Sequence, residues 1–167
     1  AALKARQDEE KMREMIRTML NTESYIEQFT LVEKLVQMHG HYAVPLLIEV
    51  LGDSREQEKR VRAIGYIRRL GEEGVLAVIE LLESPNVLLQ QNASIILGMI
   101  RDRRAIPALQ RAVEKSQDSG VRSQAGEALS KMGWSGKATD AYSRLAEAYL
   151  KEYPLVMQTT YKDWVVW

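Results

Sequence analysis

The sequence predicts an all-α protein built as a solenoid of about four to five antiparallel helix pairs. First, one segment occurs three times, beginning at His41, Glu72 and Arg103, so that the repeat length is 31 residues. Second, apolar side chains recur every three or four positions, as they do in amphipathic helices. Third, 46% of the 167 residues are hydrophobic, 28% are charged and none is cysteine, which is typical of a folded chain without disulfides. A repeat near this length is typical of stacked two-helix units.

Residues 1–40 are predicted to form two capping helices. The first is expected over 3–20, because its apolar side chains have helical spacing from Met12 onward. The second is expected to end at Gly40 and to turn one apolar stripe inward. That stripe comprises Ile26, Phe29, Val32, Leu35 and Val36. Together the two helices would cover one end of the array.

Residues 41–133 are predicted to hold three repeats, at 41–71, 72–102 and 103–133, each with two helices. In the second helices Ala63, Ala93 and Ala125 correspond, and such small side chains let neighbouring helices approach closely. Ser54 with Gln57 resembles a capping box, and Ser84 followed by proline resembles an N-cap. The side chains predicted to face inward are Val44, Leu47, Ile48, Leu51, Ala63, Ile64, Ile67, Leu70, Val75, Val78, Ile79, Leu82, Leu89, Ala93, Ile96, Leu97, Ile100, Ile106, Leu109, Val113, Val121, Ala125, Ala128, Leu129 and Met132.

The third repeat carries a family resemblance. Its first helix reads Ala-Ile-Pro-Ala-Leu at 105–109, and its second reads Val-Arg-Ser-Gln-Ala-Gly-Glu-Ala-Leu-Ser-Lys-Met-Gly at 121–133. This pattern resembles the HEAT-like repeat, in the short bacterial form also seen in phycobilisome lyase subunits. The resemblance covers roughly residues 41–133. It implies a right-handed α–α superhelix whose second helices line a concave surface that binds other macromolecules.

Residues 134–167 are predicted to form a C-terminal aromatic helical cap. Segment 141–154, Ala-Tyr-Ser-Arg-Leu-Ala-Glu-Ala-Tyr-Leu-Lys-Glu-Tyr-Pro, resembles one helix of a tetratricopeptide repeat. The aromatic side chains of this region either cover the end of the array or form an interface, since tyrosine and tryptophan are favoured interface anchors.

No catalytic constellation occurs in the sequence. The two histidines, His39 and His41, flank a glycine, and no third ligand stands nearby at a spacing that would suggest a metal site. The sequence also lacks a nucleophile motif and a phosphate-binding glycine loop. We therefore expect a protein that is not an enzyme, has no catalytic residues and uses no cofactor or metal.

The expected function is protein–protein interaction or scaffolding, as a subunit or fragment of a larger assembly. Positions opposite the inward stripe of the second helices are candidates for contact, as are the C-terminal aromatics. The basic helix of the first repeat (Lys59, Arg60, Arg62, Arg68 and Arg69) could grip an acidic or helical segment of a partner. The candidate partner-binding residues are Arg62, Arg69, Asn92, Ile95, Met99, Gln124, Lys131, Tyr153, Tyr161, Trp164 and Trp167.

Two alternative functions stay open at this point. One is nucleic-acid binding along the basic helix, although 23 basic and 23 acidic residues cancel and so disfavour a phosphate-binding protein. The other is a lyase-like subunit that handles a chromophore, which rests on the family resemblance. No apolar run reaches the ~18 residues of a membrane-spanning helix. We expect a soluble protein, favour the cytoplasm over the periplasm, and leave open an oligomer or hetero-complex.

Overall fold

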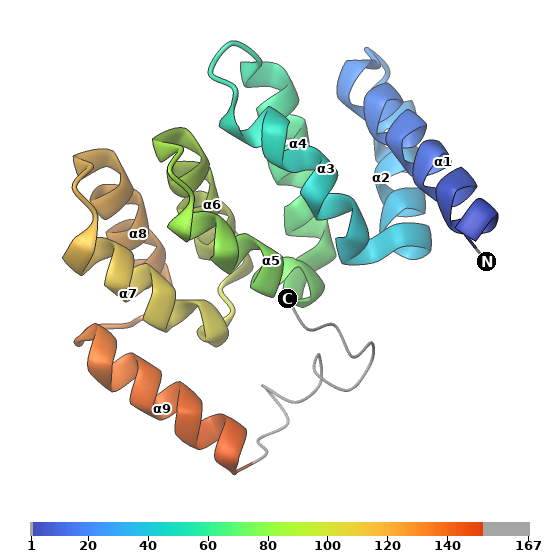
Figure 1. Cartoon of the computed structure of the whole chain (residues 1–167). Helices are drawn as coiled ribbons and strands as arrows, with labels where there is room; N and C mark the ends of the chain where they lie inside the picture. Colours follow the sequence, from blue (N-terminus) through green and yellow to red (C-terminus); the bar gives the residue numbers. More distant parts are fainter. Residues whose placement is uncertain (1, 152–167) are drawn as a thin grey trace. The chain divides into compact units, whose positions relative to one another are not determined.

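A computed structural model describes residues 2–151, with side chains from residue 8 onward. Within residues 2–151 all regular structure is helical and no strand occurs. The predicted fold class is confirmed: the chain is an all-α helical-repeat solenoid (Figure 1). It divides into two compact units, residues 1–77 and 78–167. The predicted division into 1–40, 41–133 and 134–167 follows the repeats rather than these units, and it stays a prediction.

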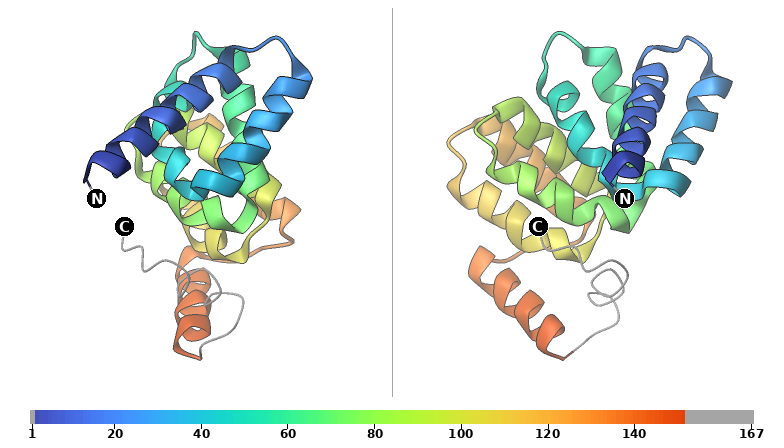
Figure 2. Two further views of the ribbon diagram at one scale, coloured as in Figure 1. Left: turned by 90° about the vertical axis from the view of Figure 1, so that its right-hand side faces the viewer. Right: turned by 45° about the vertical axis from the view of Figure 1, so that its right-hand side comes forward.

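Unit 1 consists of two helix pairs. Helices α1 (Ala2–Asn21) and α2 (Tyr25–His39) run antiparallel and lie side by side (Figure 2). Helices α3 (Val44–Gly52) and α4 (Gln57–Leu70) form the first repeat, and α4 also contacts α1 and α2. Single 3₁₀ turns at Gly40–Ala43 and Gly71–Gly74 lead into the next helices. Fully buried side chains in this unit include those of Met19, Leu35, Leu47, Leu51, Tyr66 and Ile67.

Unit 2 continues the same pattern. Helix α5 (Val75–Glu80) crosses the boundary between the units and is followed by 3₁₀ turn η3 (Leu81–Glu83), which packs on α6 (Val87–Ile100). Helix α7 (Ile106–Lys115) packs against α8 (Ser119–Lys131) and α9 (Ala138–Leu150), and α6 packs against α8. Among residues 2–151, no helix combines the length and the hydropathy that crossing a membrane requires.

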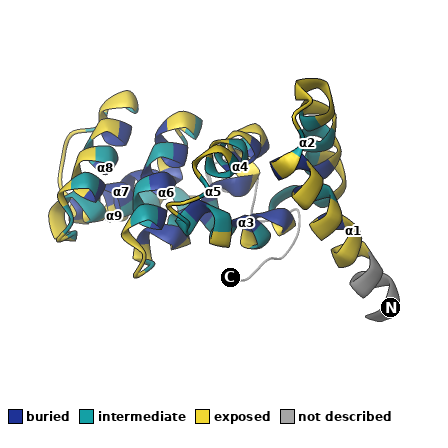
Figure 3. Cartoon of the chain, turned by 90° about the horizontal axis from the view of Figure 1, so that it is seen from above, coloured by how far each residue is buried: buried dark blue, intermediate teal, exposed yellow. Residues whose placement is uncertain are grey.

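The inward stripes predicted for the three repeats are confirmed. All of the corresponding alanines, Ala63, Ala93 and Ala125, are fully buried. Of the 25 side chains predicted to face inward, Ile48, Ile64, Ile79, Ile100, Val113 and Met132 are half-buried and the rest are buried. Figure 3 shows this contrast between the buried inner faces and the exposed outer faces of the helices. Stacked pairs of this kind bury a stripe that one pair alone would leave in water.

The stripe predicted for α2 is wrong in its first half. Ile26 and Phe29 are 82% and 66% exposed, and of the five predicted side chains only Leu35 is fully buried. Helical spacing identifies an apolar face, but it does not say whether another element covers that face. Within the described residues nothing covers the face of α2 that carries Ile26 and Phe29.

Two predicted helix caps are also wrong. Helix α4 begins at Gln57 behind Glu56, and no side chain caps it, so Ser54 and Gln57 form no capping box. Helix α6 begins at Val87, and the cap is Asn86 rather than Ser84, since the Asn86 side chain accepts a hydrogen bond from the Leu89 amide. In both turns the chain runs two residues further before the helix starts, so that a later residue takes the capping position.

Candidate partner-binding surface

An open groove of about 510 Å³ lies between α2 and α4 in unit 1. One face of each helix lines it. The α2 positions are Tyr25, Gln28, Phe29, Val32 and Glu33, and the α4 positions are Glu58, Val61, Arg62, Gly65, Tyr66 and Arg69. Both sets follow the three-and-four spacing that places residues on one side of a helix.

Large apolar side chains stand exposed around this groove. Tyr25 is 86%, Phe29 66% and Val61 63% exposed, and neighbouring Ile26 is 82% exposed. Single exposed apolar residues are ordinary on protein surfaces, but clusters that include aromatic rings mark contact surfaces. This cluster is the largest departure of unit 1 from a solvated helical surface.

The bottom of the groove is fixed by Tyr66. Its side chain is fully buried, and its hydroxyl donates a hydrogen bond of 2.8 Å to the carbonyl oxygen of Gly40. Burial, and to a lesser extent the nearby Glu73 carboxylate, raise the pKa of the Tyr66 phenol well above its usual value. The hydroxyl therefore stays protonated and keeps donating to the backbone at the turn after α2, where Gly40 has a positive φ of 51°.

The two arginines predicted as partner contacts in unit 1 both line the groove, and both are already paired. Arg69 forms a bidentate ion pair with Glu33 of α2, with Nε–Oε1 and Nη2–Oε2 distances of 2.6 and 2.9 Å. This hydrogen bonding to Glu33 raises the pKa of Arg69. Arg62 donates to the carbonyl oxygens of Leu20 and Thr22 and to Glu58, at 2.9 Å from the last. It thereby satisfies carbonyl groups at the C-terminal end of α1.

The positions predicted in unit 2 have a different setting. On α6, Asn92 is buried, Ile95 is half-buried and Met99 is 43% exposed. On α8, Gln124 is half-buried, and Lys131 is exposed and paired with Glu127 at 2.8 Å. At Gly98 the helices α6 and α8 meet at backbone level: a Cβ on Gly98 would lie 2.9 Å from the Cβ of Ala128.

Tyr153, Tyr161, Trp164 and Trp167 lie outside the described residues. A partner-binding role for these four and for the seven described candidates stays a prediction. Sequence reasoning missed Tyr25, Val61 and Gly65, and it placed Phe29 on the inside. The available signal was the density of large apolar residues in the first turns of α2, which exceeds what one buried stripe needs.

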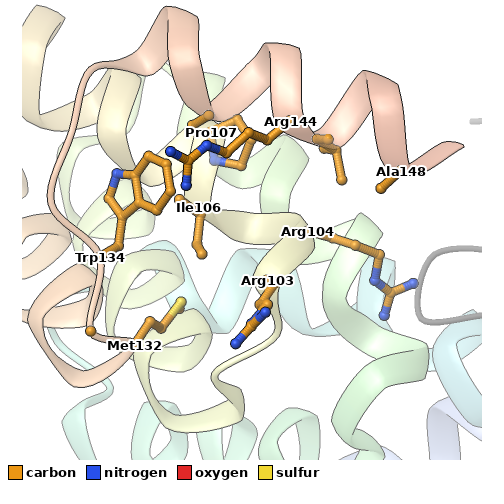
Figure 4. Close-up of a pocket in the computed structure, with 11 residues that line it drawn as sticks. Arg103, Arg104, Ile106, Pro107, Met132, Trp134, Arg144 and Ala148 are labelled. Atoms are coloured by element: carbon orange, nitrogen blue, oxygen red, sulfur yellow. The ribbon is translucent and has the colours of Figure 1, made fainter. Parts of the chain in front are cut away.

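A second pocket, of about 360 Å³, lies among α7, the end of α8 and α9 (Figure 4). The guanidinium of Arg144 lies 5.2 Å from the centre of the Trp134 ring, a cation–π contact. Arg103 and Arg104 also line the pocket but point away from this pair (Figure 4). Arg104 is buried and joined to Asp102 by an ion pair of 2.6 Å, and the Asp102 side chain caps the turn before α7 by accepting a hydrogen bond from the Arg104 amide.

In the described part of the chain, no group of three or more histidine, aspartate and glutamate side chains is placed to hold a metal ion. His39 and His41 are half-buried at the turn after α2.

Comparison with known proteins agrees with the helical architecture. The family profile of HEAT repeats matches residues 75–160, which is just over half of the chain. The chain belongs to the HEAT repeat family. This HEAT protein is also similar to deoxyhypusine hydroxylase of Danio rerio, with 34% identity over 90 residues. The match covers 53% of this chain and 30% of the relative, so that the chain corresponds to less than a third of that protein.

Proposed function

We propose that the chain is a non-catalytic protein-interaction module, a subunit or fragment of a larger assembly, that binds a partner protein through the α2–α4 groove. The observation that supports this is the exposed cluster of Tyr25, Phe29 and Val61 around a groove whose charged side chains are already paired with each other. Aromatic residues at the centre of a contact surface contribute most of the binding free energy in many interfaces. Stacked helix pairs also present the extended surfaces that repeat proteins use for binding.

The test is a site-specific crosslink. A photoreactive phenylalanine analogue replaces Phe29 in the full chain, which is then irradiated in an extract of the source cells. The expected result is one identified protein crosslinked at position 29, in an amount that falls with Gly65→Leu and is unchanged with Gly126→Leu. A chain that crosslinks nothing at position 29, or equally well with Gly65→Leu, would contradict the proposal.

Gly65 and Gly126 make a matched pair for this purpose. Both lie in helices, in α4 and α8, and a Cβ added at either one meets no atom within 4 Å. The Cβ of a leucine at either position therefore meets no neighbour, and leucine has a higher helix propensity than glycine. Only leucine at 65 occupies the groove.

Nucleic-acid binding along α4 is the less favoured candidate. Four of the five basic side chains in this helix already have partners: Lys59 pairs with Glu56, Arg60 with the carbonyl of Asp53, Arg62 with Glu58 and Arg69 with Glu33. In the described part of the chain, Arg68 alone among the five has no ion pair or hydrogen bond. Phosphate binding would need these charges, and its affinity would fall steeply with salt.

The finer family resemblances are also proposals. A lyase-like subunit would transfer or bind a pigment, and failure of the purified chain to do either would remove that reading. The HEAT match runs through α9 to residue 160, which favours α9 as the first helix of another HEAT pair over a tetratricopeptide helix. The hydroxylase activity belongs to the Danio rerio relative, and the short match gives no reason to propose it for this chain.

A further inference from the structure

We infer that the occupant of the α2–α4 groove is an amphipathic helix of a partner protein, two to three turns long, that presents an uncharged apolar stripe. This inference rests on the proposed function and names the class of partner segment. Four observations support it. Three concern the groove: its length, its paired polar groups and the open space above Gly65. The fourth is that no other helix in the described chain presents a continuous exposed apolar stripe.

The length of the groove fits a short helix. Its lining residues run from Tyr25 to Glu33 on α2 and from Glu58 to Arg69 on α4. At 1.5 Å per residue these stretches are roughly 12 and 16 Å long. A helix of about eight to eleven residues covers the same distance, and it presents apolar side chains at i, i+3 or i+4 and i+7.

The polar groups of the groove favour a helix over an extended peptide. An extended segment needs partners for its backbone N–H and C=O groups, whereas a helix satisfies its own. The Tyr66 hydroxyl is bonded to Gly40, and the charged lining residues form the pairs Glu33–Arg69 and Glu58–Arg62. Among the lining side chains, the Gln28 amide and the exposed Tyr25 hydroxyl have no hydrogen bond in the described residues. The groove therefore offers two separate polar contacts, both on α2, and no row of donors and acceptors.

The charge balance of the groove specifies the face of the occupant. The two acidic and two basic lining side chains cancel within the groove. A charged residue facing them would lose hydration without gaining an unpaired partner. The contacting stripe is therefore apolar, and its binding depends little on ionic strength, unlike association driven by charge.

Gly65 provides the place for the main anchor. It stands between Val61 and Arg69 on the groove face of α4, and a Cβ added there meets nothing within 4 Å. A large apolar side chain of the partner fits above this glycine and contacts the exposed rings of Tyr25 and Phe29. Removing such a side chain from water favours binding.

A second copy of the chain does not supply this helix in the part that the structure describes. Helix α9 exposes Tyr142 and Leu150, at 44% and 83%. The positions between them on the same face are the half-buried Leu145 and Tyr149 and the small Ala146, so that α9 lacks a continuous stripe of large exposed side chains. The other large exposed apolar residues outside the groove form no stripe either: Ile26 and Met38 lie near opposite ends of α2, Tyr42 in the turn that follows, and Val87 and Met99 near opposite ends of α6.

The experiment selects helices on the intact chain. A phage-displayed library of 14-residue helical peptides (roughly four turns) is randomised at four positions of one face and selected on the immobilised protein. The expected result is convergence on large apolar residues at those positions. Synthetic peptides from the selection should bind wild type and Gly126→Leu within about twofold of each other, and Gly65→Leu about tenfold or more weaker. Their affinity should change little between low and moderate salt.

Three outcomes would overturn the inference. Selected peptides that are acidic at the randomised positions would indicate a charged site. Equal affinity for Gly65→Leu and wild type would place binding outside the groove, and a selection without enrichment would mean that the groove binds no helix. Concentration-dependent self-association that Gly65→Leu abolishes would identify a second copy as the occupant. If the selection fails while the position-29 crosslink succeeds, the proposed function stands and only the helical partner is wrong.

Discussion

The α2–α4 and α6–α8 pairs are built from successive second helices of the repeats, yet one pair is open and the other closed. In the closed pair Gly98 brings α6 against Ala128 of α8, with no room for even a methyl group. In the open pair the glycine, Gly65, faces a groove, and the aromatic side chains around it stay in solvent. Glycine therefore allows close helix packing in one unit. In the other unit it leaves open space in the groove, which we propose a partner occupies.

The two pairs also differ in how much of their apolar surface is buried between their helices. The α6–α8 pair buries its apolar groups internally, with Ile96, Leu97, Ala125 and Leu129 in the core. The α2–α4 pair instead adds the Glu33–Arg69 ion pair between its two helices and leaves Phe29 and Val61 exposed. A helix pair that buries its apolar side chains leaves little apolar surface for a partner to contact, whereas a pair that exposes them leaves such a surface.

Breaking the closed pair should produce the largest effect. Gly98→Val places side-chain atoms where the Cβ alone would already lie 2.9 Å from the Ala128 Cβ and 3.0 Å from its Cα. We expect a loss of about 2 kcal/mol in the free energy of unfolding, because overpacking forces the helices apart. Urea unfolding followed by circular dichroism measures it. Ala128→Gly in the same chain should restore part of the loss, since the two sites are in contact; no rescue would mean that the contact is not the cause.

Removing the hydroxyl at the bottom of the groove should have an intermediate effect. Tyr66→Phe leaves the buried carbonyl of Gly40 without the hydrogen bond that Tyr66 donates. The expected loss is about 1 kcal/mol of unfolding free energy. Thermal unfolding of wild type and variant at the same concentration measures it. An unchanged midpoint would show that solvent replaces the hydroxyl, and hence that the groove is wetter than the burial of Tyr66 suggests.

Filling the open pair by one methyl group should stabilise the chain slightly. Gly65→Ala adds a Cβ that meets no neighbour and removes the flexibility of a glycine in the middle of α4. The expected gain is about 0.5–1 kcal/mol. The same urea titration applies, with Gly126→Ala as the matched control that should gain similarly. Destabilisation by Gly65→Ala alone would mean that α4 bends at this position or that the groove is closed.

Acid should weaken the closed pair through Asp118. Hydrogen bonds from the Val121 backbone amide and the Gln91 side chain hold the pKa of Asp118 below its usual value. The pKa of Asp118 is lower in the folded state than in the unfolded state. The carboxylate therefore stabilises the fold fully at pH values above its unfolded-state pKa, and this stabilisation is lost as the pH falls through its folded-state pKa. Gln91→Ala should therefore reduce the stability difference between pH 7 and acidic conditions. Unfolding at both pH values measures the change, and an identical pH dependence in wild type and variant would remove this role.

The repeats were predictable because their signal is local and occurs three times. Ala63, Ala93 and Ala125 share a register position, and all three are buried as that register requires. The groove was not predictable, because exposure of Phe29 depends on what the remaining chain does or does not place over it. Arg62 shows the same limit: its guanidinium bonds to carbonyl groups some forty positions earlier in the chain, and no local pattern announces that contact.

The most direct test of the open groove is to map where a selected helical peptide binds. Amide chemical shifts of the isotope-labelled full chain are recorded with and without peptide. The account predicts perturbations concentrated at Tyr25–Glu33 and Glu58–Arg69 and absent from α6 and α8. Perturbations centred on α6 and α8, with α2 and α4 unchanged, would contradict it.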